Sequence, residues 1–130
     1  MPLRVLIADD SEVMRMGMRT LIGMKPGWQV CGEAVNGDEA IAMVLERSPD
    51  VIIFDLTMPG KNGFEAASEI RRIAPSTKIV FYSVHDVPAA AKEVGGDAFV
   101  SKSNAAEELL ATIERVVSLP IKTRTKIKSA

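Results

Sequence analysis

Cysteine and histidine are almost absent from this sequence, which excludes two kinds of site. Cys31 is the single cysteine among 130 residues, so a disulfide cannot form within the chain. His85 is the single histidine, whereas zinc sites are built from several histidine or cysteine ligands. Cys31 lies in an alternating stretch between Gln29 and Gly32, and we interpret it as a small buried residue on a strand. Neither a disulfide scaffold nor a zinc centre is expected.

Long hydrophobic runs and glycine-rich phosphate loops are also missing. The longest apolar run, Ala40 to Leu45, is far too short to cross a membrane. The N-terminal apolar stretch is interrupted by Asp9 and Asp10 before it could act as a signal peptide. The chain has no Gly-x-Gly-x-x-Gly motif, which argues against a dinucleotide enzyme. We therefore expect a cytoplasmic protein without a membrane partner.

Positive charge is concentrated at the C-terminal end. The chain has a formal net charge of -1, from 16 Lys+Arg and 17 Asp+Glu. Residues 121–130 contain four basic residues and no acid, which leaves 12 basic against 17 acidic residues in the rest of the chain. A body with this acidic balance is not expected to hold nucleic acid by itself. The length fits one domain over residues 1–120, followed by a basic flexible tail or truncated linker at 121–130.

Hydrophobic periodicity predicts an α/β fold. Short apolar runs bounded by turn residues indicate strands at 5–8, 28–34, 51–54, 78–82 and 98–101. Helices are expected at 38–46, 63–74, 89–94 and 107–117, and a first one after Ser11, with Met14, Gly17, Met18 and Leu21 on one face. This alternation predicts a flavodoxin-like doubly wound sheet of five parallel strands in the order 2-1-3-4-5. Five helices are expected, and the fourth is unusually short.

Asp55 directly follows the buried strand 51–54, so it lies at the carboxyl end of that strand. Asp9 and Asp10 follow the first strand, and the predicted strand order brings all three carboxylates into one pocket. Carboxylates at this separation repel one another unless a cation or raised pKa values relieve the repulsion. Oxygen ligands alone favour Mg²⁺ or Mn²⁺. The alternative is that Asp9 or Asp10 only caps the first helix.

Ser83 follows the fourth strand and Lys102 the fifth, which adds a hydroxyl and an ammonium to the same sheet edge. A metal, a carboxylate, a hydroxyl and an ammonium are together suited to phosphoryl transfer to Asp55. In such a reaction the carboxylate attacks, while the metal and the lysine neutralise the charge that develops on the phosphoryl oxygens.

Residues 4–117 resemble the receiver domain of bacterial two-component response regulators. The resemblance is carried by Asp9-Asp10, Asp55, Met58-Pro59-Gly60 followed by Asn62-Gly63, Ser83, and Phe99-Val100-Ser101-Lys102. It implies that Asp55 accepts a phosphoryl group from a sensor histidine kinase. It also implies a signalling phosphoacceptor rather than an enzyme, limited to self-phosphorylation and slow self-dephosphorylation.

The resemblance implies a set of metal and phosphoryl contacts. The side chains of Asp10 and Asp55 and the backbone carbonyl of Thr57 would hold Mg²⁺ or Mn²⁺, and Asp9 would act through a bound water. Lys102 would contact the phosphoryl group.

Switching and rate tuning are implied for other residues. Ser83 would swing toward the phosphoryl group, and Phe99 would follow inward. Thr57 and His85 lie where the family tunes the rate of hydrolysis. The simpler alternatives are core packing for Phe99, a loop-start hydroxyl for Ser83 and a surface loop position for His85.

Residues 4–10 and 32–37, and the absence of proline after Lys102, are similar to the NarL/LuxR-like subgroup, whose receivers precede a helix-turn-helix domain. The resemblance implies transcriptional control, with DNA contacted only through an output domain that this chain does not contain. It also implies a homodimer through either the helix 4/strand 5/helix 5 face or the helix 1/helix 5 face. Ser83 and Lys102 are 19 positions apart, fewer than the family usually has, which shortens helix 4.

Other functions of this fold class fit the residues less well. A haloacid dehalogenase-type hydrolase needs a second aspartate two positions after Asp55, where this chain has Thr57. A flavodoxin-like electron carrier needs a phosphate loop after the first strand, where Asp9 and Asp10 would repel phosphate. The main alternative is an interaction module of the receiver fold that works without phosphorylation.

Overall fold

The computed structural model describes residues 2–58, 63–84 and 95–118 and shows strands alternating with helices. The strands are β1 (Leu3–Ala8), β2 (Trp28–Ala34), β3 (Val51–Phe54), β4 (Lys78–Ser83) and β5 (Ala98–Ser101). The helices are α1 (Glu12–Gly23), α2 (Gly37–Arg47), α3 (Gly63–Ile73) and α5 (Ala106–Val117). The expected fourth helix at 89–94 and the tail at 121–130 lie outside the described residues.

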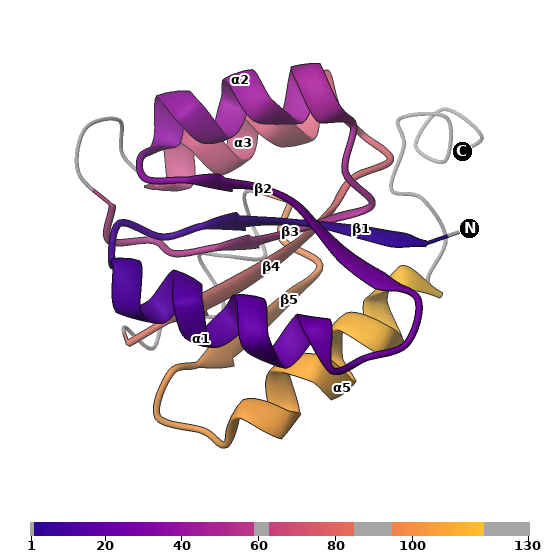
Figure 1. The fold of residues 1–130 in the computed structure, drawn as a ribbon. Coiled ribbons are helices and arrows are strands. Elements are labelled where there is room, and N and C mark those ends of the chain that lie inside the picture. The colour runs from indigo at the N-terminus through magenta and orange to yellow at the C-terminus, as the bar shows by residue number, and fades with distance from the viewer. Residues whose placement is uncertain (1, 59–62, 85–94, 119–130) are drawn as a thin grey trace, which may run out of the picture.

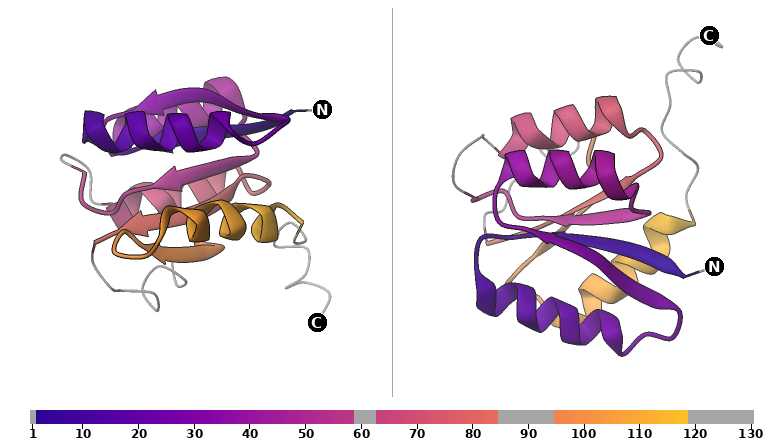
Figure 2. Two further views of the ribbon diagram at one scale, coloured as in Figure 1. Left: turned by 60° about the horizontal axis from the view of Figure 1, so that its bottom comes forward. Right: turned by 45° about the horizontal axis from the view of Figure 1, so that its top comes forward.

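The five strands form one parallel sheet in the order β2-β1-β3-β4-β5, which confirms the predicted topology. Helices α1 and α5 cover one face of the sheet, and α2 and α3 cover the other (Figures 1 and 2). Right-handed crossovers place α1 on one face, because the connection from β1 to β2 runs toward one edge of the sheet. They place α2 and α3 on the other face, because the connections from β2 to β3 and from β3 to β4 run toward the opposite edge. Among the described helices, none is long and apolar enough to span a bilayer.

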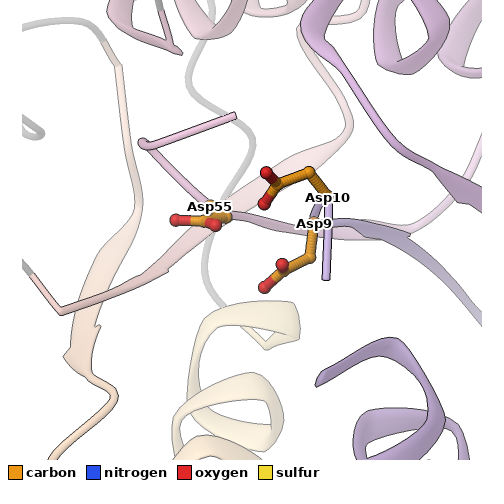
Figure 3. A group of neighbouring side chains, drawn as sticks. All are labelled: Asp9, Asp10 and Asp55. Atoms are coloured by element: carbon orange, nitrogen blue, oxygen red, sulfur yellow. The ribbon is translucent and has the colours of Figure 1, made fainter. Parts of the chain in front are cut away.

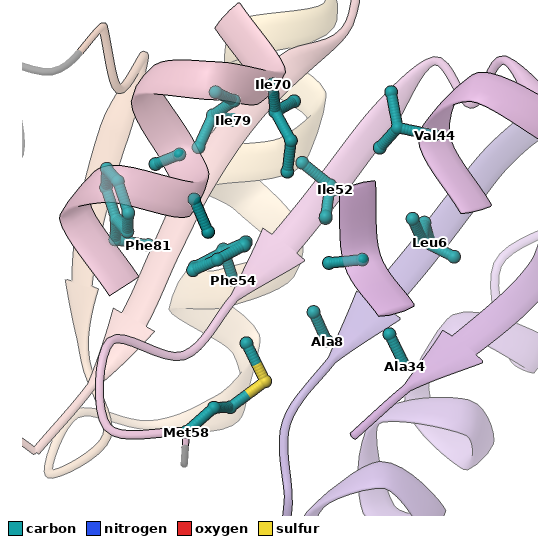
Figure 4. Close-up of a cluster of buried hydrophobic side chains, with 13 residues drawn as sticks. Leu6, Ala8, Ala34, Val44, Ile52, Phe54, Met58, Ile70, Ile79 and Phe81 are labelled. Atoms are coloured by element: carbon teal, nitrogen blue, oxygen red, sulfur yellow. The ribbon is translucent and has the colours of Figure 1, made fainter. Parts of the chain in front are cut away.

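The sheet separates two hydrophobic clusters. One fills the space beneath α2 and α3 and includes Leu6, Ile52, Phe54 and Phe81 (Figure 4). The other lies beneath α1 and α5. Every residue of β3 is buried, because its alternate side chains enter the two clusters. The apolar run at 51–54 is therefore a central strand, as predicted.

Helix α1 begins where the sequence predicts, and most of its predicted apolar face turns inward. Ser11 is the N-cap, and its side chain accepts a hydrogen bond from the backbone N–H of Met14. Met18 and Ile22 are the buried residues of this helix, whereas Gly17 is exposed. Met14 of the predicted face packs against the cluster beneath α1 and α5 as well, so the inward face keeps Met14 and Met18 but extends to Ile22 rather than to Gly17. Val13 and Met16 are left exposed on the outer side.

Candidate functional site

Two acidic residues of the site continue the hydrogen-bond ladder of the sheet beyond the ends of their strands. The backbone N–H of Asp55 donates to the Ala8 carbonyl at 2.9 Å, and that of Asp9 donates to the Ala34 carbonyl at 3.0 Å. These bonds tie the end of β3 to β1 and the end of β1 to β2. The carboxylates of Asp9 and Asp55 are therefore carried on backbone that belongs to the sheet.

The three predicted carboxylates meet at the carboxyl ends of β1 and β3 (Figure 3). One oxygen from each of Asp9, Asp10 and Asp55 lies within 4.8 Å of the others. Asp9 and Asp55 are 1% and 2% exposed, whereas Asp10 is exposed. A cluster of oxygen donors with one open side fits a hard divalent cation such as Mg²⁺, which keeps several of its waters when bound.

Lys102 supplies the positive charge of this site. Its ammonium lies 2.8 Å from Asp9 Oδ2 and 3.4 Å from Asp55 Oδ2. Burial of the ammonium lowers its pKa, but the hydrogen bond that it donates to Asp9 and the charges of Asp55 and Asp9 outweigh burial, so the net pKa is raised. The backbone N–H of Lys102 donates to the Ser83 carbonyl at 2.9 Å, which fixes the end of β5 against β4. The predicted convergence of Lys102 with the acids is confirmed.

The loop after β3 holds the Asp55 carboxylate. Asp55 Oδ1 accepts hydrogen bonds from the backbone N–H of Thr57 at 3.1 Å and from its hydroxyl at 2.9 Å. Met58 is 6% exposed and anchors this loop in the cluster beneath α2 and α3. A Cβ on Gly63 would lie 2.7 Å from the Leu56 carbonyl oxygen, so only glycine lets α3 begin this close to the loop.

Asp9 also has a local role at the strand-to-helix junction. Its Oδ1 accepts a hydrogen bond from the backbone N–H of Ser11 at 2.9 Å, while its other oxygen contacts Lys102. The N-cap of α1 is Ser11 itself, so capping is not the function of Asp10. The alternative in which Asp9 or Asp10 only caps α1 is therefore insufficient for Asp10, because Ser11 caps the helix and the Asp10 carboxylate lies with those of Asp9 and Asp55.

The two predicted switch residues lie on adjacent strands. Ser83 is fully buried at the end of β4. Phe99 on β5 is half-buried, pairs with Phe81 in the parallel register and packs against the cluster beneath α2 and α3. His85, which the sequence nominates for rate tuning, lies outside the described residues.

Arg15 and Glu33 border the acidic cluster and were not predicted. Arg15 on α1 contacts both Glu33 at the end of β2 and the backbone carbonyl of Asp9. No sequence motif joins two polar residues that are 18 positions apart on different elements. The sequence gives no local signal for these contacts, because they depend on how α1 is rotated over the sheet.

Known proteins resemble this chain over most of its length. A sequence profile of the family described as "Response regulator receiver domain" matches residues 5–114. The transcriptional regulatory protein PdtaR of Mycobacterium tuberculosis is 36% identical over 119 residues, which is 90% of this chain and 58% of that protein. The nitrate/nitrite response regulator NarL of Escherichia coli is 36% identical over 121 residues, 90% of this chain and 56% of its own length. The chain thus spans little more than half of these relatives.

Solved structures agree with the sequence relatives. A LuxR-family two-component response regulator from Aurantimonas has a TM-score of 0.86 at 32% identity, covering 99% of this chain and 94% of its own. A LuxR-family DNA-binding response regulator from Staphylococcus aureus has a TM-score of 0.82 at 30% identity, with 89% and 99% covered.

Proposed function

We propose that this chain, which belongs to the family of response regulator receiver domains, accepts a phosphoryl group on Asp55 and thereby changes how it binds a partner. The family predicted from the sequence is confirmed, and its relatives include NarL and LuxR-family regulators. Receiver domains are signalling phosphoacceptors that take phosphoryl groups from histidine kinases and bind Mg²⁺ at an acidic pocket. The observation that carries the proposal is Lys102, held between two buried carboxylates at the edge of the sheet.

Metal binding is assigned to the exposed side of the cluster. Asp10, Asp55 and the Thr57 carbonyl would hold Mg²⁺ or Mn²⁺, and Asp9 would act through a bound water. The ion would supply charge neutralisation for the phosphoryl oxygens. The oxygen-only donor set supports this assignment, because hard divalent cations prefer such ligands.

Phosphoryl transfer requires Asp55 to be presented as a nucleophile. One carboxylate oxygen forms the bond to phosphorus while the bond between phosphorus and its donor, a histidine nitrogen or an acyl oxygen, breaks. The hydroxyl of Thr57 lies 2.9 Å and 3.1 Å from the two carboxylate oxygens, so it must turn away from the attacking one. The Lys102 ammonium lies 3.4 Å from Asp55 Oδ2 and can follow the charge from the carboxylate to the phosphoryl oxygens.

We assign signal output to Ser83 on β4 and Phe99 on the adjacent strand β5. Ser83 would reach toward the phosphoryl group, and Phe99 would fill the space that this movement opens; Thr57 and His85 would tune the lifetime of the phosphorylated state. The position of Phe99 between the surface and the core supports this role, because a half-buried ring can move without opening a large cavity.

The partners are proposed from the relatives. A histidine kinase donates the phosphoryl group, and a second copy of the chain docks through the α1/α5 face or the face that includes β5 and α5. The exposed Val13 and Met16 favour the α1 side. NarL and the LuxR-family regulators support an output in transcriptional control, with DNA contacted by a further domain.

Intact mass spectrometry after incubation with acetyl phosphate and Mg²⁺ tests the proposal. We expect the mass of one phosphoryl group to be added to the wild type and to be absent from Asp55→Asn and from samples with chelator. Self-dephosphorylation would then be followed as slow loss of this mass. If wild-type protein gains no mass and also binds no beryllofluoride, the phosphoacceptor function is wrong and the phosphorylation-independent interaction module is favoured.

A further inference from the structure

Arg15 connects the acidic cluster to β2. Its Nη1 donates to the backbone carbonyl of Asp9 at 2.9 Å, and its Nε donates to Glu33 Oε1 at 3.1 Å. The side chain of Arg15 is 15% exposed and that of Glu33 is 23% exposed, so the pair is largely shielded from water. Arg19, one turn further along α1, contacts the other oxygen of Glu33 at 2.5 Å but has no contact with Asp9 among the described residues.

The Asp9 carbonyl belongs to the peptide group that joins Asp9 to Asp10. Because a peptide group is planar, fixing the direction of its carbonyl also fixes the direction in which the chain leaves toward Asp10. The preceding peptide is already fixed, since the Asp9 N–H donates to the Ala34 carbonyl. Residues 33 and 34 at the end of β2 therefore hold both peptide groups of Asp9, one directly and the other through Arg15.

Asp10 depends on this arrangement more than the other two acids do. Asp9 is held by Lys102 and Ser11, and Asp55 is held by Thr57. Asp10 is exposed, so packing does not fix the direction of its carboxylate. The orientation of its backbone is therefore the main restraint that keeps its oxygen within reach of Asp55.

We propose that Arg15, held in place by Glu33, is a positioning residue that orients the Asp9–Asp10 peptide and so sets the affinity of the acidic cluster for Mg²⁺. This inference rests on the proposed function, because it concerns the same metal site. Within the described part of the chain, Arg15 contacts the Asp9 carbonyl and Glu33 but neither the reacting groups nor the side chains assigned to the ion. It acts through the backbone of the residue that precedes Asp10.

Replacing Arg15 should change the Mg²⁺ affinity in one direction if its charge matters most and in the opposite direction if it acts by positioning the backbone. A guanidinium close to the cluster repels a second cation, so removing its charge alone would tighten Mg²⁺ binding. Loss of orientation would weaken binding, because the cluster would no longer present its oxygens together. Arg15→Met keeps the unbranched shape and leaves Glu33 paired with Arg19.

The experiment measures Mg²⁺ dissociation constants by isothermal titration calorimetry for the wild type, Arg15→Met, Arg15→Lys and Arg19→Met. Arg15→Lys keeps the charge but replaces the planar fork by a point charge. Arg19→Met is the matched control, because it removes a charge and an ion pair to Glu33 without changing any contact to Asp9. We expect Mg²⁺ to bind about 10-fold more weakly to Arg15→Met, more weakly also to Arg15→Lys, and with nearly unchanged affinity to Arg19→Met.

The phosphorylation rate provides a second readout. For both Arg15 variants, the Mg²⁺ concentration that gives half of the maximal rate with acetyl phosphate should rise, while the rate at saturating Mg²⁺ should stay close to that of the wild type. Tighter Mg²⁺ binding by Arg15→Met with unchanged binding by Arg15→Lys would show a charge effect and overturn the inference. So would a loss of thermal stability with no change in Mg²⁺ affinity. Failure of the wild type itself to bind Mg²⁺ would instead overturn the proposed metal site and the inference together.

Discussion

The ammonium of Lys102 lies 2.8 Å from the carboxylate of Asp9, although the two residues are 93 positions apart in the chain. The side chains are 12% and 1% exposed. Such a pair is costly to break, because removing one partner leaves a buried charge without compensation. The contact thus joins the carboxyl ends of β1 and β5 across the two strands between them. It also keeps the lysine beside Asp55 before any phosphoryl group arrives.

The raised pKa of Lys102 predicts that the free energy of unfolding falls at alkaline pH. A folded pKa above the ordinary value of 10.5 means that this contribution is complete below that pH and is lost as the pH rises through the folded pKa. Burial raises the pKa of Tyr82 above its ordinary 10.0, which adds to the loss. Urea unfolding of Lys102→Met between pH 7 and 11 should give lower stability at pH 7 and a shallower alkaline decline than the wild type.

Tyr82→Phe is the control for that series. It removes the phenol and leaves the contacts of Lys102 with Asp9 and Asp55 in place. Its alkaline decline should be shallower than that of the wild type, because the contribution of the Tyr82 phenol is gone while that of Lys102 remains. If the unfolding free energy of the wild type and of Lys102→Met fell equally steeply with pH, the two carboxylates would not raise the folded pKa of Lys102.

Replacing Asp10 by Asn should stabilise the metal-free protein and abolish its stabilisation by Mg²⁺. The first effect comes from reduced repulsion within the cluster and should be small, about 0.5–1 kcal/mol, because Asp10 is exposed. The second follows because a ligand stabilises only the state that binds it. Thermal melts with and without Mg²⁺ measure both. Glu46→Gln, on α2, is the control and should keep the full response to Mg²⁺. A melting temperature of metal-free Asp10→Asn below that of the wild type would contradict repulsion among the three carboxylates.

Two helical glycines should respond oppositely to alanine. Gly63→Ala brings a Cβ within 2.7 Å of the Leu56 carbonyl oxygen, so the loop or the helix must shift, and stability should fall by roughly 1–3 kcal/mol. Gly17→Ala meets no atom within 4 Å and should stabilise α1 by roughly 0.5–1 kcal/mol. Urea midpoints measure both. A stable Gly63→Ala variant would mean that α3 does not begin against this loop.

If the chain dimerises through α1, charged substitutions on the outer face of that helix should disrupt the dimer. Val13 and Met16 are 76% and 49% exposed and lie one turn apart, so lysine at both positions should abolish a dimer that uses them. Sedimentation velocity with and without beryllofluoride would measure the change. Leu45→Lys, on α2 at the opposite face of the sheet and 64% exposed, is the matched control and should leave the dimer intact. An unchanged dimer in the α1 variant would direct attention to the face that includes β5 and α5.

Strand prediction succeeded where apolar residues ran together between turn residues. The segments 51–54 and 98–101 were placed without error from their apolar runs. The edge strand at 28–34, which is only partly buried, was placed from its alternation and β-forming residues. The start of β1 was predicted two residues late, since Arg4 interrupts the apolar pattern while its backbone still pairs with Gln29. In α1 the pattern could not fix the rotation, because apolar residues such as Val13 and Met16 also lie on its outer side.

The proximity of the candidate site residues could be predicted where those residues directly follow strands. Asp9, Asp55 and Lys102 were brought together by strand order alone, because parallel strands end at a common edge. Arg15 and Glu33 could not be placed in this way. Their contact depends on the rotation of α1 over the sheet, and that rotation is set by packing of the helix rather than by any local signal.

The hydrogen bonds from the backbones of Asp9, Asp55 and Lys102 to the adjacent strands have a consequence for motion. Amides bonded in this way exchange with solvent deuterium only when the sheet itself opens, so they should be protected almost as strongly as the central strand. A conformational signal that starts at Asp55 therefore cannot begin by moving these backbones. It must leave the site through side-chain rotation and through the connecting loops, while the backbone of the sheet stays in place.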